Sequence, residues 1–67
     1  MPGKNDKELD LIRLGGLLRR RREALGVTQA EVARRCGMHA TFVASVERGE
    51  RNVSFVTLLR IVRAMDT

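Results

Sequence analysis

Residues 28–48, TQAEVARRCGMHATFVASVER, decide the fold of this chain. The stretch reads as a short helix, a tight turn and a second short helix. Thr28 can accept a hydrogen bond from the backbone N–H of Glu31, whose side chain can reach back to Thr28, and this reciprocal capping box is typical of a helix N-terminus. Gly37 ends the first helix, because glycine adopts the left-handed conformation at little cost. The second helix is expected to run from about Ala40 to the end of the stretch.

Two short helices joined so tightly form a helix-turn-helix, the motif that lays its second helix in the major groove of duplex DNA. The composition supports this interpretation. The 67 residues carry 13 basic and 8 acidic side chains, a formal net charge of +5, and eleven of the 13 basic residues are Arg, which binds phosphate through a bidentate fork. A basic surface that is merely solvated would explain the charge equally well. The absence of Trp and Tyr disfavours single-strand binding, which depends on aromatic stacking.

A longer helix is predicted before the motif, from about Leu9 to Gly26, because leucines recur at the spacings of one helical face at Leu11, Leu14, Leu18 and Leu25. Residues 1–8 show no periodicity and read as a flexible N-terminal arm, which leaves residues 9–67 as the domain. Gly15 and Gly16 each weaken a helix by about 1 kcal/mol relative to Ala, so we expect them to admit the close approach of another element.

A fourth helix is predicted over residues 55–66, with Ser54 as its N-cap. Its apolar side chains cover too broad a face for a single contact. Part of this face is expected to pack on the helix-turn-helix, and the remainder needs another cover, for which a second copy of the chain is the natural candidate. The predicted dimer interface consists of Val53, Phe55, Val56, Leu59 and Val62.

Two charged residues fall on apolar helical faces. Arg22 occupies the missing position in the leucine stripe, and Glu47 follows Val43 by four residues on the inner side of the third helix. An unpaired buried charge costs several kcal/mol, so the two are predicted to pair; the alternative is that both side chains reach water at the helix edges. The rest of the Arg19–Arg22 tract reads as a solvated helical face rather than a localisation signal.

The residue inventory does not support catalysis or a metal site. Cys36-x-x-His39 has zinc-ligand spacing, but it offers two ligands where a structural site uses four. We find neither a nucleophile–base pair nor a Gly-rich phosphate loop after a strand, so no enzyme activity, cofactor or small-molecule ligand is expected. The apolar runs are far shorter than the roughly 20 residues of a membrane helix. With one unpaired Cys and no signal peptide, the expected location is cytoplasmic.

Residues 14–65 resemble the Cro/repressor (Xre-type) helix-turn-helix domains of phage repressors and bacterial regulators. The matching residues are Gly15, Leu18, Arg22, the run Gly26–Gln29, Glu31, Ala33, Gly37, Val43, the run Glu47–Gly49, Leu58, Leu59 and Ile61. The segment ERGERNVS, residues 47–54, is similar to the small controller proteins of restriction-modification systems, which bind DNA as homodimers. The resemblance implies an all-α, lambda-repressor-like DNA-binding domain of four or five helices with a central helix-turn-helix.

The same resemblance implies roles for individual residues. The residues expected to face the bases in the major groove are His39, Ala40, Thr41, Phe42, Ala44 and Ser45. Those expected at the DNA backbone are Thr28, Gln29, Arg48, Arg51, Asn52 and Ser54. In this family the positions of Arg22 and Glu47 form a buried salt bridge, in agreement with the pairing argued from the apolar faces.

The chain departs from the family pattern at three points. Arg21 stands at a position that is usually apolar, so the first helix is expected to pack less deeply there. His39 stands where a Ser, Thr or Asp cap is usual, so either that cap is weaker or His39 reads DNA. The fifth helix, which many members use to dimerise, has no counterpart before Thr67.

The sequence therefore predicts a transcriptional regulator that binds a two-fold symmetric operator as a homodimer, with its recognition helices in major grooves about 34 Å apart. One alternative is a protein-interaction module, such as an antitoxin-like partner that uses the fourth helix. Another is a basic membrane-surface binder, although the glycines of the first helix and the absence of Trp count against it. Because the recognition helix bears short side chains, thymine methyl contacts, His39 and DNA shape are expected to carry much of the specificity.

Overall fold

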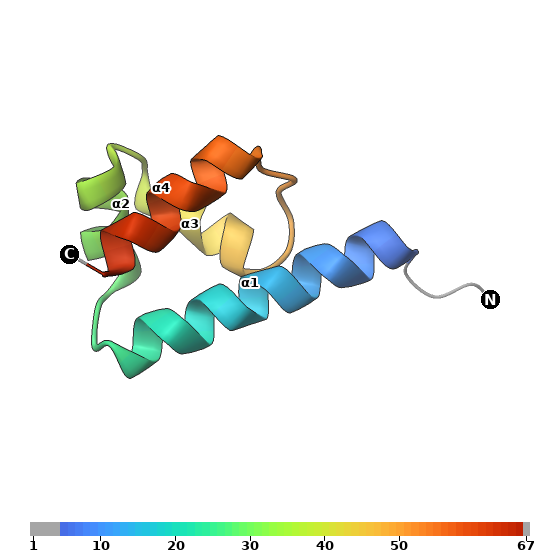
Figure 1. The fold of residues 1–67 in the computed structure, drawn as a ribbon, viewed down its shortest axis with the longest axis horizontal. Coiled ribbons are helices and arrows are strands. Elements are labelled where there is room, and N and C mark those ends of the chain that lie inside the picture. The colour runs from blue at the N-terminus through green and yellow to red at the C-terminus, as the bar shows by residue number, and fades with distance from the viewer. Residues whose placement is uncertain (1–4, 67) are drawn as a thin grey trace.

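The computed structural model describes residues 5–66 and contains four helices in that range: α1 (Asp6–Ala24), α2 (Gln29–Cys36), α3 (Ala40–Glu47) and α4 (Phe55–Met65). Figure 1 shows α1 running along one side of the molecule, with α2, α3 and α4 gathered on the other. The first turns of α1 extend beyond the other helices, so the molecule measures 42 × 22 × 18 Å. The predicted all-α fold with a central helix-turn-helix is confirmed. None of the helices between residues 5 and 66 is long and apolar enough to span a bilayer.

Helix α1 begins earlier than its apolar periodicity predicts. The Asn5 side chain accepts a hydrogen bond from the Glu8 backbone N–H at 2.8 Å and caps a first turn that contains Asp6 and Glu8. Such a cap, with acidic residues at the positive end of the helix dipole, stabilises a helix start without any apolar residue. The predicted arm is therefore wrong for residues 6–8, which are helical. Residues 1–4 of that arm, and residue 67, lie outside the described residues.

Helix α2 has the ends that the sequence predicts, with one difference. Thr28 Oγ1 accepts a hydrogen bond from Glu31 N–H at 3.1 Å, and Gly37 ends the helix in the left-handed conformation with φ of 72°. The return half of the capping box does not form. The Glu31 carboxylate instead accepts hydrogen bonds from Arg34 and Arg35 on the next turn, because these guanidinium groups offer a charged partner.

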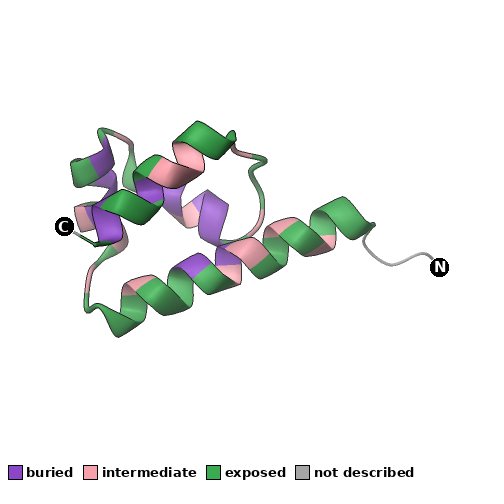
Figure 2. Ribbon diagram, in the orientation of Figure 1, coloured by how far each residue is buried: buried purple, intermediate pink, exposed green. Residues whose placement is uncertain are grey.

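The core lies where the inner faces of α2, α3 and α4 meet one face of α1 (Figure 2). Its buried apolar residues are Leu18, Val32, Ala33, Cys36, Val43, Val46, Ile61, Ala64 and Met65. Most of these side chains are small or branched, so the helices approach closely. Leu25, predicted on the leucine stripe of α1, is 42% exposed because the helix ends at Ala24 and the chain turns away. Arg21 is exposed and forms an ion pair with Asp66 at 3.0 Å, which agrees with shallower packing there.

Gly15 lets α1 approach the end of α3. A Cβ atom built on Gly15 would lie 2.5 Å from the backbone oxygens of Val46 and Glu47, closer than real Cβ contacts come. A Cβ atom on Gly16 would meet nothing within 4 Å. The expectation that these glycines admit another element is therefore right for Gly15 and wrong for Gly16. The contact matters for function because it fixes the distance between α1 and the predicted recognition helix.

Gly15→Ala is expected to destabilise the protein by about 1–3 kcal/mol, because the new methyl group must push α1 away from α3. Gly16→Ala is the matched control: the methyl group has room, and Ala is the better helix former, so stability should rise by up to about 1 kcal/mol. Urea unfolding followed by circular dichroism measures both changes. Equal stability of the Gly15→Ala protein and the wild type would contradict the close contact.

Candidate nucleic-acid interface

A buried ion pair joins α1 to α3 behind the predicted DNA-binding face. Arg22 Nε donates to Glu47 Oε2 at 2.6 Å, and Arg22 Nη2 donates to Glu47 Oε1 at 3.0 Å. The third guanidinium nitrogen donates to the Val27 carbonyl oxygen at 2.9 Å. The Arg22 and Glu47 side chains are only 11% and 4% exposed. The pair expected from the apolar faces is thus present, and it also holds the segment that leads into α2.

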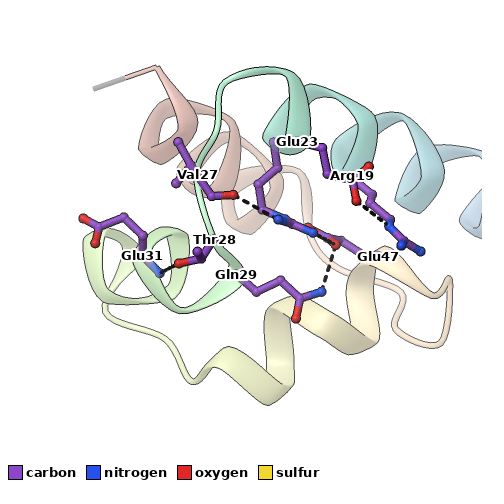
Figure 3. A network of polar contacts seen from close by, with 8 residues as sticks. Arg19, Glu23, Val27, Thr28, Gln29, Glu31 and Glu47 are labelled. Atoms are coloured by element: carbon purple, nitrogen blue, oxygen red, sulfur yellow. Dashed lines mark hydrogen bonds and ion pairs between the residues drawn. The ribbon is translucent and has the colours of Figure 1, made fainter.

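Gln29 completes this network from the first turn of α2 (Figure 3). Its Nε2 donates to Glu47 Oε1 at 2.9 Å, so three hydrogen bonds converge on one carboxylate. Burial by itself would raise the pKa of Glu47, but the hydrogen bonds from Arg22 and Gln29 outweigh it and hold this pKa below its ordinary value. The family resemblance implies that Gln29 contacts a phosphate. Here its amide is turned toward Glu47, which leaves the second amide N–H for such a contact.

The outer face of α3 carries small side chains. Ala40 and Thr41 are exposed and Ala44 is half-buried, as expected for residues that face a groove. His39 is the N-cap residue of α3 by backbone conformation, but its side chain makes no capping hydrogen bond. The weaker cap anticipated for this position is therefore observed, and the imidazole remains at the surface.

Ser45 is buried, although the sequence predicts that it faces the bases. It is 7% exposed, and its hydroxyl donates a hydrogen bond to the Phe42 carbonyl oxygen at 2.7 Å. Ser45 follows Thr41 by four residues and so shares its side of α3, about 200° from the buried Val43 and Glu47. The Ser45 hydroxyl is thus bonded within α3, and the base contact expected for this residue stays a prediction.

Phe42 and Arg51 lie together at the junction of α3 and the loop that follows it. The Arg51 guanidinium carbon stands 5.6 Å from the centroid of the Phe42 ring, within the range of a cation–π contact. Arg51 and Asn52 are exposed in this loop, as residues near a DNA backbone must be. The Ser54 hydroxyl accepts from the Thr57 backbone N–H at 3.1 Å and caps α4 as predicted. The Phe42 ring therefore supports the Arg51 guanidinium at the surface of this loop.

A hollow of about 460 Å³ gathers several predicted interface residues with others from the ion-pair network. It is lined by Arg19, Arg22, Thr28, Gln29, Ala44, Glu47 and Arg48. Three elements thus bring the predicted groove-facing Ala44 next to the predicted backbone-contacting Thr28, Gln29 and Arg48. The Arg19 side chain is 63% exposed, as predicted for a solvated face, but the sequence does not predict its place in this hollow. The available signal was its spacing, since Arg19 and Arg22 lie one helical turn apart and so share a face.

Arg48, at the rim of this hollow, forms two hydrogen bonds with the Glu50 carboxylate, both 3.0 Å long. The hydrogen-bonded carboxylate raises the pKa of Arg48, and the guanidinium lowers the pKa of Glu50. Both side chains are more than half exposed. Within residues 5–66, His, Cys, Asp and Glu side chains form no cluster of three or more that could hold a metal ion.

A short helix placed by a buried ion pair, small side chains outward and arginines beside it define a helix-turn-helix domain. The profile of the family described as "Helix-turn-helix domain" matches residues 13–67, and this chain belongs to that family, in its Xre-type branch. The members are DNA-binding transcription regulators rather than enzymes.

Two of the three similar proteins described next are named as control or controller proteins. The crystal structure of the restriction-modification controller protein C.AhdI from Aeromonas hydrophila is similar with a TM-score of 0.86 and 40% sequence identity, over 92% of this chain and 90% of that one. Control protein C.SmaI of Serratia marcescens is 42% identical over 41 residues, 61% of this chain and 49% of C.SmaI, so the match spans about half of that relative. The uncharacterized HTH-type transcriptional regulator y4dJ of Sinorhizobium fredii is 36% identical over 52 residues, 78% of this chain and 68% of y4dJ.

Glu47→Ala is expected to lower the free energy of unfolding by about 3 kcal/mol, because it leaves the buried Arg22 guanidinium without its partner. Glu50→Ala is the matched control: it also removes a carboxylate bound to an arginine, but at the surface, where the effect should be much smaller. Urea titration of both variants at neutral pH gives the comparison. Similar small losses in the two variants would contradict a buried pair.

The stabilisation from Glu47 also has a defined pH dependence. Because the pKa of Glu47 is lower in the folded chain than in the unfolded chain, this stabilisation is fully present above the unfolded value of about 4.3. It is lost as the pH falls through the folded pKa. The stability difference between the wild type and Glu47→Ala should therefore shrink in acid, and a difference that grows there would contradict the assignment.

Proposed function

We propose that this protein is a transcriptional regulator that binds a two-fold symmetric operator in duplex DNA as a homodimer. The observation that carries the proposal is the network of Arg22, Gln29 and Glu47, which fixes α3 against α1 and α2 from the inside. With its inner face so occupied, α3 presents Ala40, Thr41 and the half-buried Ala44 outward. One copy of α3 would enter the major groove in each half of the operator.

The proposed contacts are of two kinds: those that position the DNA backbone and those that read the bases. Thr28, Gln29, Arg48, Arg51, Asn52 and Ser54 would hold the DNA backbone, and such contacts set the register without reading sequence. The residues that would face the bases are His39, Ala40, Thr41, Phe42, Ala44 and Ser45. Since this set contains no Arg, Asn or Gln, the side chains that read bases through two hydrogen bonds, specificity would rest on His39, on contacts with thymine methyl groups and on DNA shape.

The proposed dimer interface is the uncovered apolar face of α4, together with Val53 before it. Phe55 and Val56 are 71% and 66% exposed, and Val62 is 38% exposed. The neighbouring Val53 and Leu59 are half-buried. Side chains of this size gain about 1.5–3 kcal/mol each when water is removed from them, so a second copy of the same face would be a favourable cover. The homodimer is also what the resemblance to controller proteins implies.

The likeness to C.AhdI and C.SmaI favours a controller role within a restriction-modification system. The protein would then act on promoter DNA in the cytoplasm, with the sign of its effect set by where the operator lies. The alternative, an interaction module that docks a different protein on α4, draws on the same exposed apolar face. Binding to duplex DNA separates the two.

Selection from random duplexes is expected to return an inverted repeat with half-sites about one helical turn apart. Arg48→Ala and Arg51→Ala should weaken binding to that duplex, with a smaller dependence on salt because fewer counterions are released. Arg13→Ala removes an exposed arginine of α1 from outside the proposed backbone-contacting set and serves as the control. Indifference of the wild type to duplex DNA at low salt, together with tight binding to another protein, would favour the interaction module.

Val56→Glu is expected to convert the dimer to a monomer, because it places a carboxylate in an apolar contact. The matched control is Leu17→Glu, which makes the same kind of change at a 57% exposed residue of α1 outside the proposed interface. Sedimentation equilibrium measures the association, and thermal unfolding checks that both variants fold. A Val56→Glu protein that still dimerises would rule out this face.

A further inference from the structure

Arg19 stands at the hollow between α1, α2 and α3, yet the family resemblance implies no role for it. It comes from the middle of α1 and lines the hollow together with Thr28, Gln29, Ala44 and Arg48. Figure 3 shows Arg19 close to the Glu47 network, with Gln29 directed at Glu47 from the first turn of α2 and Thr28 beside it, bonded to Glu31. A side chain in this position is next to residues that the proposed function puts against DNA.

The charges in the hollow are not equally available. Arg22 and Glu47 neutralise each other and are almost fully buried. The cations that remain accessible among the lining residues are Arg19 and Arg48, whose side chains are 63% and 57% exposed. An anion that entered the hollow would therefore meet two guanidinium groups over a neutral floor.

We propose that this hollow seats one phosphate of the DNA backbone, and that Arg19 is a DNA-binding residue that exchanges Glu23 for this phosphate. The inference rests on the proposed function, because it assigns a further contact within the same interface. Arg19 would bind the phosphate from α1, and Arg48 would bind it from the end of α3. The Thr28 hydroxyl and the free amide N–H of Gln29 would supply neutral donors at the start of α2, where the helix dipole favours an anion.

Arg19 loses little stabilisation when it exchanges Glu23 for a phosphate. Its Nε donates to Glu23 Oε2 at 3.2 Å, one turn along α1, and the two side chains are 63% and 53% exposed. Exposed pairs of this kind contribute little to stability, whereas a phosphate offers a full charge to the planar fork of an arginine. Arg48 is held more firmly, through two hydrogen bonds to Glu50. Arg19 therefore gives up a weaker ion pair than Arg48 does when it binds the phosphate.

The occupant is a phosphate of duplex DNA rather than a small phosphate compound. The hollow contains Ala44, which lies on the outer face of α3 and would be covered by the bases or sugars beside that phosphate. A free phosphate would leave this apolar part of the wall in contact with water. Because the hollow reaches the outer face of the recognition helix, it favours a phosphate that is part of a DNA strand over a free phosphate.

The first test compares Arg19→Ala with Arg20→Ala, which makes the same change in charge at the next residue. Arg20 lines a different hollow, together with Ile12 and Leu17. Arg19→Ala is expected to weaken binding about tenfold at low salt, by the same factor for operator and scrambled duplexes. It should also reduce the slope of log K against log salt by about 0.9 for each bound copy. Arg20→Ala should leave the slope unchanged, and thermal unfolding should show that both variants fold.

The second test is a double-mutant cycle with Glu23→Gln. If Glu23 competes with DNA for Arg19, Glu23→Gln tightens binding in the wild type and has a clearly smaller effect in the Arg19→Ala protein. Equal tightening in both backgrounds would mean that Glu23 acts only through its long-range charge, and the exchange would be wrong. Titration with inorganic phosphate at constant ionic strength tests the other occupant. Saturable binding that competes with duplex would assign the hollow to a small phosphate and overturn the proposal.

The outcomes also separate this inference from the function on which it rests. Duplex binding by the wild type with an identical affinity and salt slope for Arg19→Ala would overturn the phosphate seat and leave the regulator standing. Absence of duplex binding by the wild type would overturn both.

Discussion

The Arg22–Glu47 ion pair is the constraint on which the rest of the structure depends. Two charges in a small aliphatic core are tolerable only when each satisfies the other, so the guanidinium and the carboxylate must meet with good geometry. Because they come from α1 and α3, that requirement sets the position of the recognition helix. Gln29 and the Val27 carbonyl complete the hydrogen bonds, which ties the start of α2 to the same point. An apolar contact of equal strength would be less directional.

Packing around this pair decides what α3 can show to a ligand. Gly15 brings α1 within contact of the backbone at the end of α3, so the helix is held along its inner side by main chain as well as by charge. The fold then does not depend on the outward residues of α3, so short side chains are sufficient at these positions. The surrounding arginines carry carboxylate partners in the free protein, as the Arg19–Glu23 and Arg48–Glu50 pairs show. These carboxylates partly neutralise the basic face until an anion that binds the arginines more tightly replaces them.

Patterns along single helices predicted much of this arrangement. The caps at Thr28 and Ser54, the left-handed Gly37 and the apolar faces of the four helices follow from local preferences and the helical period, and the structure contains them. Other features differ from the sequence prediction because they depend on neighbours that are distant in sequence. Gly15 and Gly16 look alike in the chain, yet only one faces α3. Ser45 has the helical position of an outward residue, yet it is only 7% exposed and its hydroxyl donates to the Phe42 carbonyl oxygen.

The sequence by itself determined the helices, the turn between α2 and α3, and the need for Arg22 and Glu47 to find each other, because capping, periodicity and the cost of burying charge act locally or demand one partner. It also carried the family, since those residues occur in order at the family's spacings. Only the tertiary structure decided that Gln29 turns to Glu47, that Ser45 is buried, and that Arg19 shares a hollow with Thr28 and Arg48. These are relations between helices, and they exist only once α1, α2 and α3 have packed.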